Sequence, residues 1–72
     1  MVNLMYRIDG VDLPFRTLRA AKLHVFASYT QEERIKELKD AKIYKYVDDL
    51  LVTETPIIVT ADGYSFGKTI KV

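Results

Sequence analysis

The chain has 72 residues, with 11 lysines and arginines against 10 aspartates and glutamates, one histidine and no cysteine. This length predicts one domain over residues 1–72, and a hydrophobic share of 49% with a net charge of +1 argues against disorder. The absence of cysteine excludes disulfides, thiolate zinc sites and cysteine nucleophiles. The sequence contains neither an apolar run of roughly 18 residues nor a secretory signal. We therefore expect a cytoplasmic protein that contacts no membrane.

The small size raises a question of stability. A domain this short buries only about 60% of the surface that its unfolded chain exposes. Without disulfides or a metal, a single small core leaves the folded state marginal. Either the core is efficient, or the chain completes it by association with another copy.

The first expected element is a β-hairpin over residues 4–15. Apolar and polar residues alternate on both sides of Asp9-Gly10. An Asp-Gly pair between alternating runs predicts a type I′ turn, because that turn needs positive φ at both central residues. Pro14 lacks an N–H, so it indicates an edge position or the end of the second strand.

A helix is expected over residues 18–29, with Thr17 as its N-cap. At 100° per residue, its apolar side chains fall on two nearly opposite faces. One face holds Leu18, Ala21, Val25 and Tyr29, and the other holds Ala20, Leu23 and Ala27, with Phe26 between them. A helix that is apolar on most sides is usually buried on most sides, yet one small sheet covers a single face. The second face therefore predicts contact with another helix or another subunit.

A second helix is expected to begin at Thr30. Thr30 and Glu33 have the spacing of a capping box, and acidic residues in the first turn complement the helix dipole. The apolar residues form a narrow stripe of Ile35, Leu38 and Ala41. We expect a surface helix attached along this thin edge.

The remaining chain is predicted to form strands. A hairpin is expected over residues 43–53 around Asp48-Asp49, and Pro56 is expected to interrupt the pattern. Asp62-Gly63 predicts another hairpin, and residues 64–72 alternate as one strand. The order is ββ-α-α-βββ, which predicts an α+β fold with an antiparallel sheet of four to six strands and two helices on one side. Chains of this type are common in bacteria and phages.

Three patterns invite a catalytic or ligand-binding interpretation, and each has a simpler one. Gly67-Lys68-Thr69 resembles the end of a phosphate-binding loop, but the position where that motif needs its first glycine holds Asp62. The motif also needs a following helix, and the three residues after Thr69 are too few to form one. His24 lacks an orienting partner for a general base, although Ser28 is placed to share a hydrogen bond with it. Glu33 and Glu37 share a helix face where a hard cation would fit, but we favour their simpler role as solvated charges that complement the helix dipole. We expect no enzyme, cofactor or metal.

Two functions remain. The first is a non-enzymatic protein-interaction module that forms a homodimer or docks on a larger protein. Its contact would be the second apolar face of the first helix, which consists of Ala20, Leu23, Phe26 and Ala27. The alternative is a small nucleic-acid-binding protein whose basic patch consists of Arg7, Arg16, Arg19 and Lys22. Tyrosines would provide stacking surfaces beside these charges, but nucleic-acid-binding modules usually carry a larger basic excess.

Overall fold

The computed structural model describes residues 2–72. In this part of the chain two helices and five strands follow in the order β1 (Leu4–Ile8), α1 (Leu18–Ala27), α2 (Gln31–Glu37), β2 (Lys42–Val47), β3 (Leu50–Val59), β4 (Tyr64–Phe66) and β5 (Ile70–Lys71). All strand pairs are antiparallel, and β1, β2 and β3 are neighbours in that order. The strands β4 and β5 both pair with β3, along the edge opposite β2. The expected α+β fold is confirmed.

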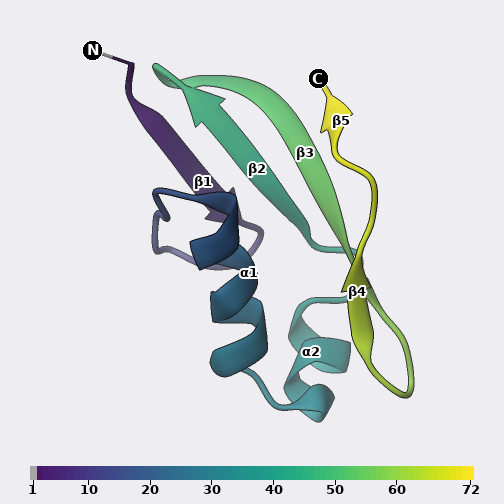
Figure 1. Ribbon diagram of the computed structural model, residues 1–72. Coiled ribbons are helices and arrows are strands. Elements are labelled where there is room, and N and C mark those ends of the chain that lie inside the picture. The colour runs from purple at the N-terminus through teal and green to yellow at the C-terminus, as the bar shows by residue number, and fades with distance from the viewer. Residues whose placement is uncertain (1) are drawn as a thin grey trace.

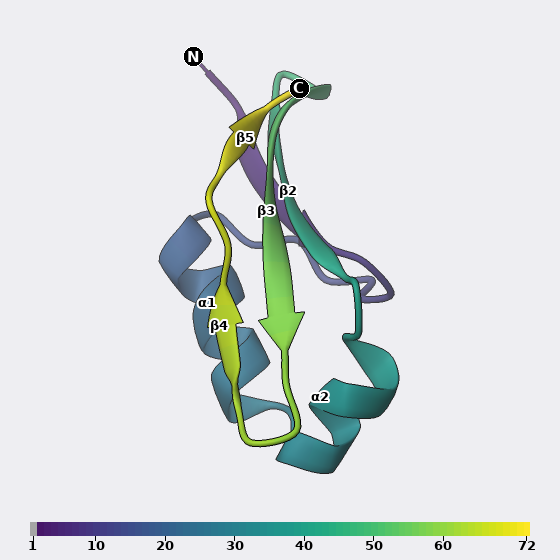
Figure 2. The same ribbon diagram turned by 90° about the vertical axis from the view of Figure 1, so that its right-hand side faces the viewer.

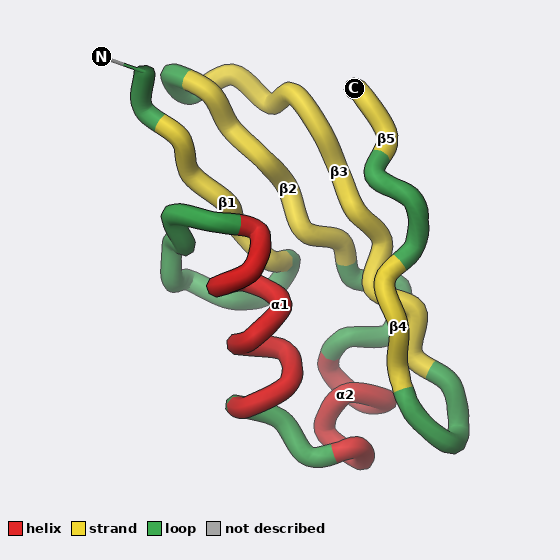
Figure 3. Tube along the Cα trace, viewed as in Figure 1, coloured by secondary structure: helices red, strands yellow, loops and turns green. Residues whose placement is uncertain are grey.

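The helices occupy different places on this sheet. Figures 1 and 2 show α1 across one face of the sheet, beside β1 and β2, and α2 below the end where β2 begins and β3 ends. The other end of the sheet, around the β2–β3 turn, extends beyond both helices (Figure 3). The molecule is accordingly elongated, with extents of 41 × 21 × 17 Å.

The hydrophobic core lies where α1, the end of α2 and the central strands meet. It consists of Ile8, Ala21, Val25, Leu38, Ala41, Ile43 and Ile57. Ile8 and Ile43 are directly opposite each other in the β1–β2 register, and Ile43 is opposite the buried Thr55 of β3. Side chains that alternate with these along each strand point to the other face of the sheet.

The predicted second strand of the first hairpin is wrong. Residues 11–14 form a loop, and the chain meets β1 again at Phe15, which exchanges backbone hydrogen bonds of 2.7 and 2.8 Å with Tyr6. Of the two turn residues, Gly10 has a positive φ of 77° and Asp9 does not, which rules out type I′. Pro14 has no N–H for a ladder, and the chain must leave the plane of the sheet to reach α1.

The hairpin around Asp48-Asp49 is confirmed, and both residues have positive φ, 49° and 70°. The predicted interruption at Pro56 is wrong, since β3 runs through it. Here β3 needs a carbonyl and no N–H, because Gly67 donates to the Pro56 carbonyl at 2.9 Å. The interruption falls on the facing strand instead, where residues 67–69 divide β4 from β5.

Both predicted helix starts are confirmed. The Thr17 side chain accepts a hydrogen bond from the backbone of Ala20 at 3.0 Å. Thr30 and Glu33 form the reciprocal capping box, with hydrogen bonds of 2.8 and 3.2 Å. The first helix ends at Ala27, two residues before the predicted end at 29.

Candidate functional site

The first helix has one buried face and one exposed face. Ala21 and Val25 are completely buried against the sheet. On the opposite side the side chain of Leu23 is 59% exposed and that of Phe26 is 62% exposed. Ala20 is half-buried and Ala27 is exposed. We call these four residues, Ala20, Leu23, Phe26 and Ala27, the outer face of α1.

The outer face is open because α1 lies at the surface of the fold. Figure 2 shows the sheet on one side of α1 and, within the described residues, no helix or strand on the other. Ala20, Leu23 and Ala27 follow one another at spacings of three and four residues. Such a row brings side chains onto one line along a helix, and small residues in it allow a neighbouring helix to approach closely.

The C-terminal end of α1 is held by Arg34 of α2. Its guanidinium donates to the carbonyl oxygens of Val25, at 3.0 Å, and Phe26, at 2.7 Å. The group also lies 4.3 Å from the centre of the Tyr64 ring and 3.4 Å from the side-chain oxygen of Gln31. The last carbonyls of a helix lack partners within it, and a cation there complements the helix dipole. Arg34 therefore fixes the position of α1, and with it the outer face.

This role of Arg34 was missed by the sequence analysis. The predicted stripe of Ile35, Leu38 and Ala41 is only partly correct, since Ile35 is 42% exposed. The buried side of α2 instead holds Arg34, which is 8% exposed, and it continues to Leu38 at the C-cap, while the buried Ala41 lies beyond the helix in the link to β2. Arg34 and Leu38 are four residues apart and therefore lie on one face of the helix. This spacing is the feature of the sequence from which the burial of Arg34 could have been predicted.

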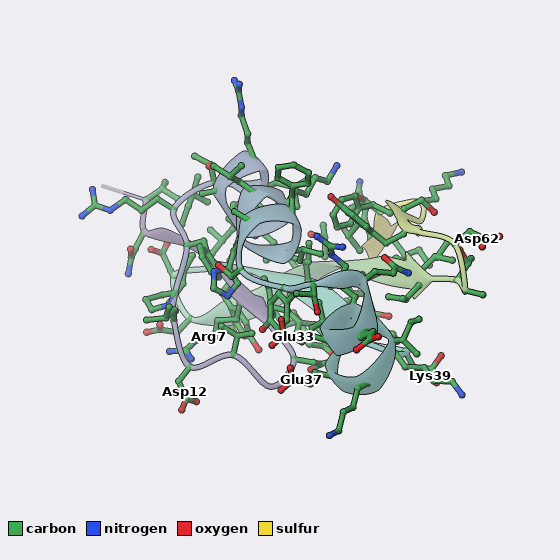
Figure 4. All side chains as sticks on the ribbon, turned by 90° about the horizontal axis from the view of Figure 1, so that it is seen from below. Arg7, Asp12, Glu33, Glu37, Lys39 and Asp62 are labelled. Carbon is green, nitrogen blue, oxygen red and sulfur yellow. The ribbon has the colours of Figure 1, made fainter. Side chains whose placement is uncertain are left out.

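The structure does not bring the four predicted nucleic-acid-binding residues into one patch. Arg16 and Arg19 are exposed at the beginning of α1, and the Lys22 ammonium lies 5.0 Å from the centre of the Phe66 ring. Arg7 is opposite Tyr44 in the β1–β2 register, next to the buried Ile8, so it points to the other face of the sheet. Figure 4 shows Arg7 on the side of the sheet away from α1.

His24 has a packing role. Its Nδ1 lies 3.1 Å from the Ser28 hydroxyl, as expected from the sequence. Its ring packs between Phe15 and Tyr29, with centroid distances of 5.1 and 5.6 Å. These contacts connect the loop before α1 to the link between the helices.

The acidic residues also serve local structure. Glu33 accepts the Thr30 N–H in the capping box. Burial, followed by the charges of Glu37 and Glu33, raises the pKa of Tyr29. Burial and the nearby Asp9 carboxylate raise the pKa of Tyr44, whose hydroxyl donates to Asp9 at 3.2 Å. In residues 2–72, groups of three or more side chains that would hold a metal ion are not found.

The segment Gly67-Lys68-Thr69 lies between β4 and β5 rather than before a helix. Gly67 passes so close to β3 that a Cβ there would lie 2.8 Å from Cγ of Pro56. The Thr69 hydroxyl is hydrogen-bonded to that of Thr55 at 2.8 Å. The geometry is that of a close crossing between strands, not of a phosphate-binding loop.

Two adjoining hollows of about 310 and 260 Å³ lie between the end of α2 and the second half of β3. Both are lined by Lys39 and Val59, and Ile35 and Ile58 contribute exposed apolar surface. Figure 4 labels Lys39 at the outside of α2. We call this region the α2–β3 groove.

Among the described residues, neither helix is long and apolar enough to cross a membrane. Comparison with protein families, curated proteins and solved structures finds no match to this chain.

Proposed function

We propose that the protein is a non-enzymatic protein-interaction module and that its contact surface is the outer face of α1. One observation carries this proposal. Leu23 and Phe26 are both more than half exposed on a helix whose opposite face, Ala21 and Val25, is completely buried. A rigid element that presents two large apolar side chains side by side is typical of a contact surface.

Removing a leucine or phenylalanine side chain from water contributes about 1.5 to 3 kcal/mol. Because Leu23 is 59% exposed and Phe26 is 62% exposed, a partner that covered both would gain about 2 to 4 kcal/mol before the cost of association. The position of α1 is fixed by Arg34 and by its packing on the sheet, so little ordering is needed when the partner binds.

Other exposed apolar residues form weaker candidates. Leu50, Ile70 and Val72 are more than half exposed, but they lie at the end of the sheet, on different strands and in the C-terminal residue. They are spread over separate strands and the chain end, although Leu4 and Leu50 both lie opposite Val47 in the strand register. The α2–β3 groove mixes apolar residues with Lys39, Asp40 and Lys42. The outer face of α1 differs because its apolar residues are neighbours on one helix.

A photoreactive amino acid at position 26, incorporated in the cells that express the protein, tests this proposal. We expect a discrete crosslinked product that disappears when Leu23→Asp is added. The control is the same photoreactive residue at position 50, which is 71% exposed but far from α1 in the fold. Equal products at positions 26 and 50, or none at position 26, would overturn the proposal. A crosslink to nucleic acid instead of protein would favour the alternative function.

A further inference from the structure

One edge of β3 is open where the strand runs past the beginning of β2. The pairing of β3 with β2 ends at Pro56, which is opposite Lys42, the first residue of β2. One further hydrogen bond follows, from the Ile57 N–H to the Ala41 carbonyl at 2.9 Å. The Ala41 N–H does not return this bond, because it donates to Leu38 at 3.1 Å. Beyond this point, in residues 2–72, α2 lies beside this edge of β3 and no strand pairs with it (Figure 2).

The backbone of Val59 points to this open edge. In an antiparallel ladder, successive residues direct their N–H and C=O groups alternately toward and away from the neighbouring strand. Gly67 donates to the Pro56 carbonyl at 2.9 Å, so the even-numbered residues of this part of β3 face β4. Val59, like Ile57, therefore directs its N–H and C=O away from β4. Within the described part of the chain neither group of Val59 has a hydrogen-bond partner on that side.

The α2–β3 groove runs along the same edge. Val59 lines both of its hollows, and so does Lys39, which follows α2. Ile35 lines one hollow and is 42% exposed, and Ile58 lines the other and is 46% exposed. Because Ile58 and Val59 are neighbours in a strand, their side chains point to opposite faces of the sheet. The groove therefore offers apolar surface on both faces of a strand that would lie beside Val59.

We infer that this edge binds an extended peptide segment of a partner protein, which adds as a strand beside β3, in line with β2. The Val59 N–H donates to a carbonyl of the peptide, and the Val59 carbonyl accepts a peptide N–H. In strand addition the main-chain hydrogen bonds provide affinity, and pockets for alternate side chains provide specificity. This edge is separate from the outer face of α1, so the peptide site stands independently of the proposed function (Figure 1).

The charges of the groove define the peptide further. Three charged residues line it, and one of them, Lys42, is paired with Glu54 at 3.2 Å. The other two, Lys39 and Asp40, are exposed and opposite in sign. The groove therefore has no excess charge with which to attract a strongly acidic or basic ligand. We expect a segment of low net charge with apolar residues at alternate positions, one toward Ile35 and the next toward Ile58.

Peptide selection followed by hydrogen exchange tests this site with the full-length chain. A phage-displayed library of random peptides of about eight residues, long enough to follow the open edge, supplies the probe. NMR then measures the exchange of each backbone amide. In the free protein the Val59 amide should exchange fast, and the Ile58 amide, which faces β4, should exchange slowly. A saturating selected peptide should slow exchange at Val59 by at least about tenfold and leave Ile58 unchanged. A bound peptide that leaves Val59 unprotected would overturn strand addition.

The alternatives give different results. A library that yields no binder, or peptides with apolar residues at the three- and four-residue spacing of a helix, would also overturn the inference. Protection of Val59 that rises with protein concentration in the absence of peptide would assign the edge to a second copy of the chain instead.

Matched substitutions locate the binding. Ile35→Ser should weaken the selected peptide about tenfold, because it removes apolar surface from the groove. Ile70→Ser is the control, since Ile70 is also exposed but lies on β5. NMR spectra of both variants show whether the fold is retained, and equal affinities would overturn the site. Leu23→Asp should leave peptide binding unchanged, so a failure here and a failure of crosslinking at position 26 are distinguishable.

Discussion

The two helices are opposites in composition and in burial. In α1 the residue Phe26 is 62% exposed, while in α2 the residue Arg34 is 8% exposed and its guanidinium donates to the carbonyl of that same phenylalanine. From hydrophobicity alone, the phenylalanine would be expected to be buried and the arginine to be exposed. The difference follows from position, since α1 lies on one face of a sheet, whereas Arg34 lies between the end of α1 and the Tyr64 ring.

The two helices also differ in the side chains that they expose to water. The side of α2 away from the core carries charged residues, which water solvates well. The side of α1 away from the core carries Leu23 and Phe26, which gain by leaving water. The surface that favours a partner is therefore on the helix that looks most like core in the sequence.

The largest expected effect is a loss of stability when a buried leucine is truncated, in contrast to an exposed one. Leu38→Ala should lower the free energy of unfolding by about 2 to 5 kcal/mol, because Leu38 is 1% exposed and the substitution leaves a cavity. Leu23→Ala should change it by less than about 0.5 kcal/mol when the protein is dilute, because Leu23 is 59% exposed. Urea denaturation at micromolar concentration measures both. Similar losses would mean that the outer face belongs to the core.

A smaller effect is expected at Arg34. Arg34→Ala removes the hydrogen bonds to the carbonyls of Val25 and Phe26 and should lower the free energy of unfolding by about 2 to 3 kcal/mol. Arg34→Lys keeps the charge but not the planar, two-sided donation, so it should recover part of the loss. Lys36→Ala on the exposed side of α2 is the control for helix composition. An unchanged stability in Arg34→Ala would show that the two helices are not coupled through this group.

The smallest expected effect is a change in how stability depends on pH. It is tested at one tyrosine next to the helices and at one tyrosine in the sheet. Burial, followed by the charges of Glu37 and Glu33, raises the pKa of Tyr29 above its ordinary value of 10.0. The folded state therefore holds this proton more tightly than the unfolded state. The resulting stabilisation is fully present below pH 10.0 and is lost as the pH rises through the folded pKa.

Tyr29→Phe should therefore flatten the fall of stability in alkaline solution. Tyr44→Phe should do the same for the sheet, since burial and Asp9 raise the pKa of Tyr44. Denaturation midpoints between pH 9 and pH 12 measure the slope that linkage predicts. A slope that neither substitution changes would assign the alkaline transition to other groups.

The sequence predicted the features that depend on neighbouring residues. The caps at Thr17 and Thr30 and the turn at Asp48-Asp49 each require a short polar side chain next to a few backbone groups, and all three are confirmed. The sequence-based predictions were wrong where the local structure depends on contacts with distant parts of the chain. Pro56 is tolerated because of what faces it across the sheet, and the strand after Asp9-Gly10 is lost because the chain must rise to α1.

For the candidate site, too, local features were predicted from the sequence and long-range ones were not. The two apolar faces of α1 were visible from periodicity, and the structure shows which of them lies in solvent. The burial of Arg34 was not predicted, because it depends on the end of α1 and on Tyr64, which is 30 residues later in the chain. The separation of Arg7 from Arg16 and Arg19 likewise depends on strand register, which net charge does not report.

The crossing of Gly67 over Pro56 also bears on how the chain avoids aggregation. A long, flat edge strand is a template for fibril growth, and short edge strands are one protection against it. Here the edge next to β3 is divided into strands of 3 and 2 residues. The division lies at a glycine whose Cβ would collide with the proline ring at 2.8 Å. Along this edge, other copies of the chain therefore find little continuous backbone on which to extend a fibril.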